Sequence, residues 1–366
     1  MIPTGFEKQI YVNSEGVRAR VLSVDNSGMY KTGLVTQGGQ NCEIAIETGS
    51  HKGEKVKGVN LFVGKYEFDK VFEKGDMAWV LLEFDSNGSV IYANMIDYYR
   101  INKQIFLIGL FVFGIISFSG FTGVRTLLSF AFAVLSIWKV LIPSMLKEYN
   151  PLLIGLVVGN TLTVTTLLLV AGFTKKAYAA ILSSMGCSLI TALMAVAFTR
   201  WYKIDGTVMQ WSESLLYTGF MSLDLTAIFQ AGIYLACSGA ILDLSIDISA
   251  ALEEIVKNNP DISRVELIKS GLSIGKSVVG SQTTTLLLAY MGSYISVMMV
   301  YMAQGTPMLN ILNSKSISAE ILHTFVGCLG LVMVSPLTSL ICGLMFEHSE
   351  EYKIRSADLN ETASDI

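Results

Sequence analysis

Long apolar stretches follow one another along the chain from residue 104 to residue 345. Each is close to the twenty or so residues that a helix needs to cross the hydrocarbon core of a bilayer. A helix satisfies its backbone N–H and C=O groups with internal hydrogen bonds, and lipid offers these groups no partners. The sequence therefore predicts an α-helical polytopic membrane bundle of about seven spans, at residues 104–120, 123–145, 151–173, 177–199, 225–248, 275–302 and 320–345.

The composition is that of an integral membrane protein. Hydrophobic residues make up 52% of the 366 residues and charged residues 15%, which is more apolar than a soluble globular chain usually is. A net charge of −4 without a basic stripe argues against nucleic acid as a partner. Four of the five cysteines fall in apolar runs, so we interpret them as small buried hydrophobes. The three histidines form no ligand motif, and neither a metal site nor a cofactor is indicated.

The first hundred residues have a different pattern, in which apolar and polar residues alternate between glycine clusters. In NCEIAIETG, the side chains of Cys42, Ile44 and Ile46 face one way, as on a half-buried strand. Asn87-Gly88 separates two strand-like runs and predicts a hairpin. About five strands are expected, which predicts a small all-β, OB-like barrel. Because no face is basic and rich in aromatic residues, we interpret it as a structural or protein-contact domain.

The chain is thus divided into an extracytoplasmic β-barrel domain (1–100), a transmembrane helical domain (101–346) and a cytoplasmic C-terminal tail (347–366). Lysines and arginines gather in the loops on one side, which places the N-terminal domain outside and the tail inside. Exporting about 100 residues before the first span needs a leading helix, and residues 1–12 are not one. We therefore expect a leading helix to be missing from the chain; the alternative is an inverted topology. The aromatic connection 200–224 is predicted to lie along the membrane surface or to dip into it.

Polar residues inside predicted spans are the candidate functional residues, because an ionisable group is costly in lipid. Asp243 lies roughly 28 Å along a helix from Asp224, near the inner membrane edge, and Asp247 follows at the interface. Lys276, in the next span, enters from the same side, so a pair with Asp243 is possible. These residues are expected to share a polar seam, formed by Asp243, Asp247, Lys276, Asn160, Gln282, Ser281 and Thr284.

Each candidate also has a structural interpretation. Asp243 and Lys276 are at least as well explained by a structural ion pair, and Asp247 and Glu254 are better explained by a solvated helix face. Asn160 and Gln282 are equally well explained by packing hydrogen bonds. Asp224 is expected to cap its helix.

The segment GAILDLSIDISAALEEI, followed by NNPDISRVELIKSGLSIGKSVVGSQTTTLLLAYMG, resembles the signature region of the YibE/F-like family of bacterial multi-pass membrane proteins. The resemblance implies an external β domain before a cluster of spans in the bacterial cytoplasmic membrane. Members of the family begin with an additional N-terminal helix. A weaker likeness, of layout alone, is to SecD/SecF and the related RND exporters: Asp243 matches the acid, and Lys276 with Ser281 matches the second element. Ser249 stands near the place of that motif's second acid.

Three functions are considered for this chain, and transport is favoured slightly over a scaffold. In the first, the protein is a permease or ion-coupled exporter in which Asp243 changes protonation or pairing. In the second, it is a membrane scaffold whose β domain binds a protein partner. An intramembrane enzyme is disfavoured because Asp224 and Asp243 lie at opposite ends of one span and HExxH is absent. The sequence specifies neither a substrate nor a coupling ion. It leaves the oligomeric state open as well, because Gly155, Gly159 and Gly280 permit packing within or between subunits.

Overall fold

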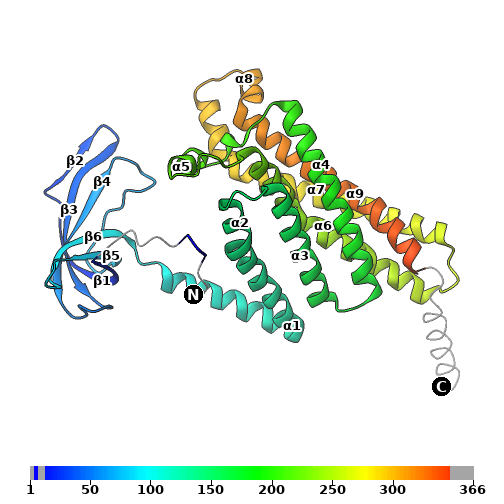
Figure 1. The fold of residues 1–366 in the computed structure, drawn as a ribbon, viewed down its shortest axis with the longest axis horizontal. Helices are drawn as coiled ribbons and strands as arrows, with labels where there is room; N and C mark the ends of the chain where they lie inside the picture. The colour runs from blue at the N-terminus through cyan, green and yellow to red at the C-terminus, as the bar shows by residue number, and fades with distance from the viewer. Residues whose placement is uncertain (1–3, 7–12, 347–366) are drawn as a thin grey trace. The chain divides into compact units, whose positions relative to one another are not determined.

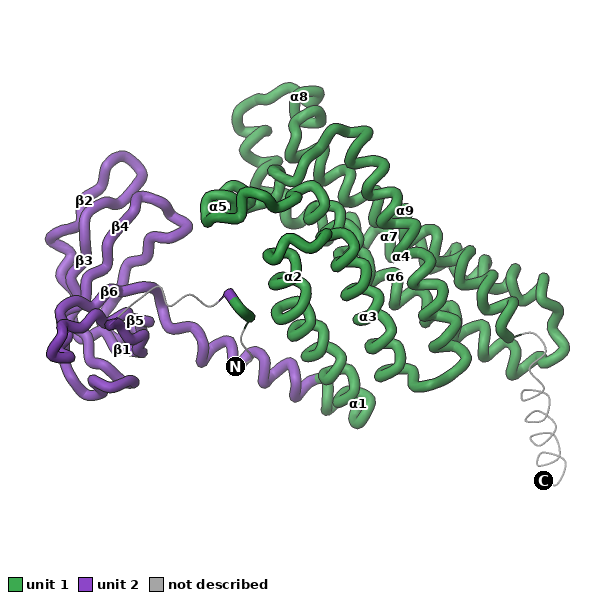
Figure 2. Tube along the Cα trace, viewed as in Figure 1, with its two compact units in different colours: residues 1–5, 115–366 green, residues 6–114 purple. Residues whose placement is uncertain are grey.

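A computed structural model describes residues 4–6 and 13–346 of the chain (Figure 1). The chain divides into two compact units (Figure 2): residues 6–114 form one, and residues 1–5 with 115–366 form the other. The predicted tail, 347–366, lies outside the described residues.

The first unit is built on a closed barrel. Its strands are β1 (Ser14–Asp25), β2 (Met29–Thr32), β3 (Val35–Ile46), β4 (Lys55–Val63), β5 (Met77–Phe84) and β6 (Val90–Tyr98). Their order is β1-β5-β6-β4-β3, and β3 pairs again with β1, which closes a five-stranded barrel; β2 extends β3 as a hairpin. All pairings are antiparallel except that of β4 with β6. The predicted small five-stranded barrel is confirmed.

The barrel core follows from alternation along its strands. Cys42, Ile44 and Ile46 all point into the core, as predicted. The hairpin predicted at Asn87-Gly88 joins β5 to β6, where Gly88 adopts a positive φ of 81°. The carboxylate of Asp85 accepts hydrogen bonds from the backbone N–H groups of Asn87 and Ser89, so the turn is held locally.

One polar layer crosses this core. Gln40 is fully buried, and its amide group donates to Asn26 Oδ1 and to the Phe72 carbonyl, both at 2.8 Å. Its carbonyl oxygen accepts from the Phe72 N–H at 3.0 Å and from Asn60 Nδ2 at 3.2 Å. Because Phe72 belongs to the loop between β4 and β5, Gln40 fastens that loop across the barrel.

The second unit is helical and begins within α1, at Ile115. The helices are α1 (Ile101–Ser136), a π-helical turn (Ile137–Leu141), α2 (Ile142–Leu146), α3 (Pro151–Ala171), α4 (Lys175–Tyr202), α5 (Ser212–Tyr217), α6 (Leu225–Asn258), α7 (Arg264–Ala303), α8 (Met308–Asn313) and α9 (Lys315–Phe346), with a 3₁₀ turn η2 at Gly206–Val208. Six helical stretches in the described residues are long and apolar enough to cross a membrane. The first of them runs for 46 residues, from Ile101 to Leu146, and the other five are α3, α4, α6, α7 and α9.

That first stretch is not one straight helix. Gly120 has φ 54° and ψ −128°, which lies outside the helical region and is a backbone conformation adopted almost only by glycine. A β-carbon on Gly123 would lie 2.7 Å from the Ile115 carbonyl oxygen, whereas residues eight apart in a straight helix are separated by about 12 Å. The chain therefore turns back at Gly120, inside α1, and Figure 1 shows a sharp bend at the α1 label.

α6 is the central helix of the bundle and packs against α3, α4, α7 and α9. Small residues bring these helices close: a β-carbon on Gly155 of α3 would lie 3.0 Å from the Ala231 side chain of α6, and one on Gly159 would overlap the Tyr234 hydroxyl. These two glycines therefore allow the close packing that the sequence predicts. Gly280 differs, because nothing lies within 4 Å of the place its β-carbon would take.

α7 and α9 pack closely at two small residues on each helix, which are spaced four positions apart. Gly271 and Gly275 of α7 lie against Ser339 and Ser335 of α9. A β-carbon on Gly275 would overlap both the Oγ and the Cβ of Ser335. The two backbones approach this closely because glycine has no side chain to hold them apart.

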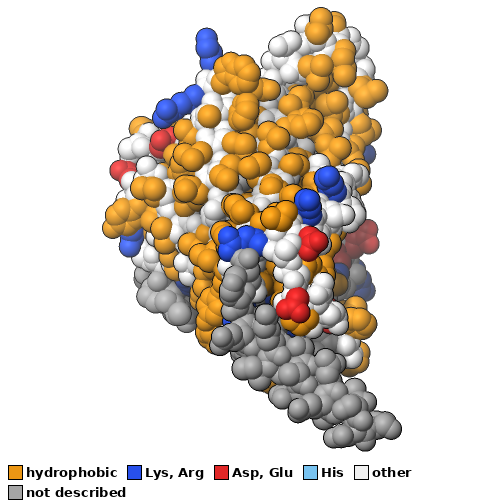
Figure 3. All heavy atoms as spheres, turned by 90° about the vertical axis from the view of Figure 1, so that its right-hand side faces the viewer, with side chains coloured by type: hydrophobic (Ala, Val, Ile, Leu, Met, Phe, Trp, Pro, Cys, Tyr) orange, Lys and Arg blue, Asp and Glu red, His pale blue; other side chains and the backbone are white. Residues whose placement is uncertain are grey.

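The surface of the helical unit is apolar. In the view of Figure 3, hydrophobic side chains cover a broad band, and charged side chains are scattered around it. On α4, for example, Leu182, Leu189 and Leu193 are each more than half exposed. A contiguous apolar surface of this kind marks contact with lipid or with another protein, in agreement with a membrane protein.

All five cysteines are free and buried, which confirms their interpretation as small hydrophobes. Burial raises the pKa of the Cys42 thiol in the barrel to about 11. That thiol is therefore protonated and unreactive at neutral pH.

Candidate functional site

The central helix α6 leaves one narrow face open. Its exposed residues recur every three or four positions, at Gly232, Ala236, Gly239, Asp243 and Asp247. The opposite face, with Ile241, Leu244 and Ile248, is buried in the core shared with α4 and α9. The two aspartates thus continue a stripe of small residues. The same helix begins at Asp224, whose carboxylate accepts a hydrogen bond from the Ala227 N–H at 2.9 Å, so the predicted cap is confirmed.

The other predicted seam residues lie on α7 and α3. Lys276, Ser281 and Thr284 are exposed on α7, and Gln282 and Asn160 are half-buried. The Thr284 hydroxyl donates to the Gly280 carbonyl of its own helix at 3.0 Å, so it is satisfied locally. The Asn160 side-chain oxygen is buried and has no hydrogen-bond partner among the described residues.

The structure does not join the predicted acid and base. Leu252 of α6 lies opposite Gly271 of α7, where a β-carbon would be 2.9 Å from Leu252 Cδ1. Moving five residues along each antiparallel helix places Asp247, rather than Asp243, at the level of Lys276. Within residues 13–346, no ion pair joins Lys276 to either aspartate at 4.0 Å or less. The expected Asp243–Lys276 pair is therefore absent in this conformation, because both side chains lie on open helix faces.

Acids at the two ends of the bundle are paired instead. Glu253, near the end of α6, is buried and contacts Lys176 of α4 at 3.3 Å and Lys257 at 3.0 Å. At the other end, Asp205 contacts Lys315 at the start of α9 at 2.7 Å. The Lys315 ammonium and the Thr207 hydroxyl lower the pKa of Asp205 to about 2. These pairs tie α4 to α6 at one end and η2 to α9 at the other.

A second group of ionisable residues lies inside the bundle, and it is not among the candidates predicted from the sequence. Glu320 and His323 lie on α9, with Glu320 Oε2 at 3.8 Å from His323 Nδ1. The His323 ring packs against Tyr290 of α7 at a centroid distance of 4.6 Å, with the two rings tilted by 30°. The signal was available, because Glu320-x-x-His323 puts two ionisable groups on one face inside an apolar span. His323 belongs to no metal-binding or catalytic sequence motif, so it is not among the predicted residues. Within the described residues no cluster of metal ligands is formed.

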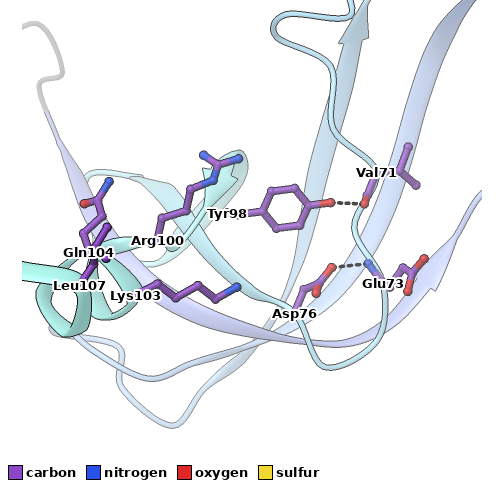
Figure 4. Close-up of a pocket in the computed structure, with 8 residues that line it drawn as sticks. All are labelled: Val71, Glu73, Asp76, Tyr98, Arg100, Lys103, Gln104 and Leu107. Carbon is purple, nitrogen blue, oxygen red and sulfur yellow. Dashed lines mark hydrogen bonds between the residues drawn. The ribbon is translucent and has the colours of Figure 1, made fainter. Parts of the chain in front are cut away.

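The barrel unit carries a hollow of its own, of about 630 Å³. Figure 4 shows Arg100 and Lys103 on one side of it, and Glu73 and Asp76 across from them. Two of these four charged side chains have partners within the unit: Arg100 contacts Asp97 at 2.7 Å, and Asp76 accepts from the Glu73 N–H at 2.7 Å. The Tyr98 hydroxyl donates to the Val71 carbonyl. We therefore place the candidate site in the helical unit.

The comparison with known families agrees with this choice. A family model described as YibE/F-like protein matches residues 107–348, which is more than half of the chain. The chain belongs to the YibE/F-like family. The matched residues cover most of α1 and all of α3 to α9, and they do not include the strands of the barrel. Searches of curated proteins and of solved structures gave no match, and the weaker likeness to SecD/SecF and RND exporters is not shown.

Proposed function

We propose that this YibE/F-like protein is an exporter-like permease of the bacterial cytoplasmic membrane, coupled to an ion gradient and without catalytic chemistry. The observation that supports it is the open face of α6, where Asp243 and Asp247 continue a stripe of small residues along the central helix. Ionisable residues within membrane helices mark substrate and ion pathways, because their burial in lipid is costly. Small residues beside them leave room for water or a solute.

Movement of the bundle would change which end of this face is open. The Glu253–Lys176 contact holds α6 to α4 at one end, and the Asp205–Lys315 contact holds η2 to α9 at the other. In the proposed cycle the two contacts break alternately. Asp243 then gains and loses a compensating cation or proton as the face opens, and Lys276 of α7 serves as a nearby positive charge.

We further propose seven crossings, with the barrel outside, the C-terminus inside and the protein inserted in the cytoplasmic membrane. The turn at Gly120 supports the count, because 46 helical residues extend for about 69 Å, roughly twice the thickness of the hydrocarbon core. Single cysteines placed at Ser119 and at Glu148, in a variant without native cysteines, test it in intact cells with a membrane-impermeant maleimide. We expect labelling at position 148 and none at position 119. Labelling of both positions would contradict the seven-span topology.

The transport proposal is tested with purified protein in liposomes that enclose a pH-sensitive dye and carry an imposed membrane potential. We expect proton entry faster than in empty liposomes, and at least tenfold slower entry for Asp243→Asn, which removes the ionisable group and keeps its size. Glu254→Gln is the matched control, because Glu254 is an exposed acid further along the same helix. Equal rates for the wild-type protein and Asp243→Asn would contradict the proposal.

A second candidate function is a membrane scaffold whose barrel, which we take to be of the OB type, binds a protein partner. Exposed apolar side chains on the β2–β3 hairpin and on the segment after β4 support it, among them Tyr30, Leu34 and Tyr66. The Tyr66 hydroxyl donates to the Leu34 carbonyl, which holds these two segments together. Photo-crosslinking from position 34 in cells distinguishes the candidates, since recovery of lipid without protein would count against the scaffold.

A further inference from the structure

The bundle encloses an acid whose charge is poorly compensated. Glu320 is 8% exposed, and within residues 13–346 the basic side chain closest to its carboxylate is His323, at 3.8 Å between Oε2 and Nδ1. The phenols of Tyr290 and Tyr294 on α7 are also titratable and lie close to the pair. The thiols of Cys237 on α6 and Cys328 on α9 lie near Tyr290. Phe229 of α6 contributes an apolar edge, with its ring centroid 6.5 Å from that of His323.

Three polar atoms in this neighbourhood are buried without a hydrogen-bond partner among the described residues. They are His323 Nε2, the Tyr290 hydroxyl and Thr324 Oγ1. Thr324 is 2% exposed and follows Glu320 by four residues, so it lies on the same face of α9. Buried polar groups are almost always satisfied, so three unsatisfied ones beside a buried acid need an explanation, such as a bound water molecule or a catalytic role. Two observations, the buried acid and the orphaned atoms, thus point to the same place.

The chemistry of the pair indicates what is bound there. An ionised carboxylate alone in an apolar interior is strongly disfavoured, and a charged imidazole without an acceptor for its second N–H is disfavoured as well. One added proton resolves both, because the loaded pair has no net charge. Removing that proton leaves one negative charge on Glu320, which becomes acceptable when water reaches the site.

We propose that Glu320 and His323 bind a proton as a pair, as a second station on the coupling pathway that includes Asp243, and that His323 Nε2 exchanges this proton with water. In loading, a hydronium ion gives a proton to Nε2 and leaves as water. Nδ1 then passes its own proton to Glu320 Oε2, so the pair gains one proton and the imidazole remains neutral. Tyr290 and Thr324 offer hydroxyl groups to the water that delivers the proton. The coupling role rests on the proposed function, whereas proton sharing by the pair does not.

The full-length protein in nanodiscs, labelled with ¹⁵N in its histidines, tests the proposal. The chain has three histidines, so the signals are few, and His323→Gln assigns the relevant ones. At one fixed pH, we expect Glu320→Gln to displace both ring-nitrogen signals of His323. The His51 signals, from a ring beside Glu54 in the barrel, stay unchanged and report that the barrel is folded.

Two further variants make the result specific. Tyr290→Phe keeps the aromatic ring and removes the hydroxyl, and we expect it to displace the His323 signals less than Glu320→Gln does. Glu254→Gln removes an exposed acid and is expected to displace neither ring-nitrogen signal of His323. Identical His323 signals in the wild-type protein and Glu320→Gln would overturn the proposal whether or not protons cross the liposome membrane. If Glu320→Gln displaces the His323 signals but no protons enter the liposomes, the two residues share a proton and the proposed transport function is wrong.

Discussion

Gly275→Leu is expected to separate α7 from α9 and to destabilise the helical unit by about 3 kcal/mol or more. Overpacking a well-packed site typically costs roughly 1–3 kcal/mol, and here even the first added carbon overlaps Ser335. Ser335 is itself buried on α9, so it cannot swing into open space. The measurement is thermal unfolding of the full-length protein in detergent, followed by intrinsic fluorescence.

Two variants control this experiment. Gly292→Leu adds the same side chain to the same helix at a position where nothing lies within 4 Å of the β-carbon, so it should change the unfolding temperature little. Gly275→Ala should destabilise less than leucine does, and adding Ser335→Gly should recover most of that loss by removing the overlapped atoms. If Gly275→Ala has the same unfolding temperature as the wild-type protein, α7 and α9 do not approach each other this closely in the folded protein.

Gln40→Leu is expected to destabilise the barrel by roughly 2–5 kcal/mol. Leucine fills much of the space but leaves the N–H and the carbonyl of Phe72 buried without partners, and each such group costs about 1–3 kcal/mol. Asn60 loses a partner too. Hydrogen exchange on the full-length protein measures the effect as faster exchange of amides in β3, β4 and the loop that contains Phe72.

The matched control is Gln37→Leu on the same strand. Gln37 is half-buried and its side chain bonds the Thr32 hydroxyl at 3.3 Å, so its loss leaves no fully buried group unpaired. Its exchange rates should stay close to those of the wild-type protein. Equal protection of the Phe72 amide in the wild-type protein and Gln40→Leu would show that Gln40 does not hold this loop.

Secondary structure was accessible from the sequence because its causes are local. The predicted spans 151–173 and 177–199 lie within two residues of α3 and α4 at each end, apart from a C-terminal extension of α4 to Tyr202. The barrel strands were visible in the alternation around Ile44, and the cap at Asp224 in its position before an apolar run. Length, alternation and capping depend on neighbours in the chain, so they need no knowledge of the fold.

The candidate site was predicted less well. Asp243 and Asp247 share a helix face, as their spacing requires, but the expected pairing of Asp243 with Lys276 is not formed. The pairing depends on the register of α6 against α7 and on how each helix is rotated. A membrane helix that is apolar on all sides carries little signal for either quantity. For the same reason, the contact of His323 with Tyr290 was not visible in the sequence.

By itself, the sequence determined that this chain has a small barrel followed by apolar helices, and that its family is the YibE/F-like one. Burial in lipid makes such helices readable, because each must be long, apolar and internally hydrogen-bonded. The tertiary structure decided which polar groups meet. It left the α6 aspartates on an open face and enclosed Glu320 with His323, because close packing at glycines such as Gly275 sets the rotation and register of each helix.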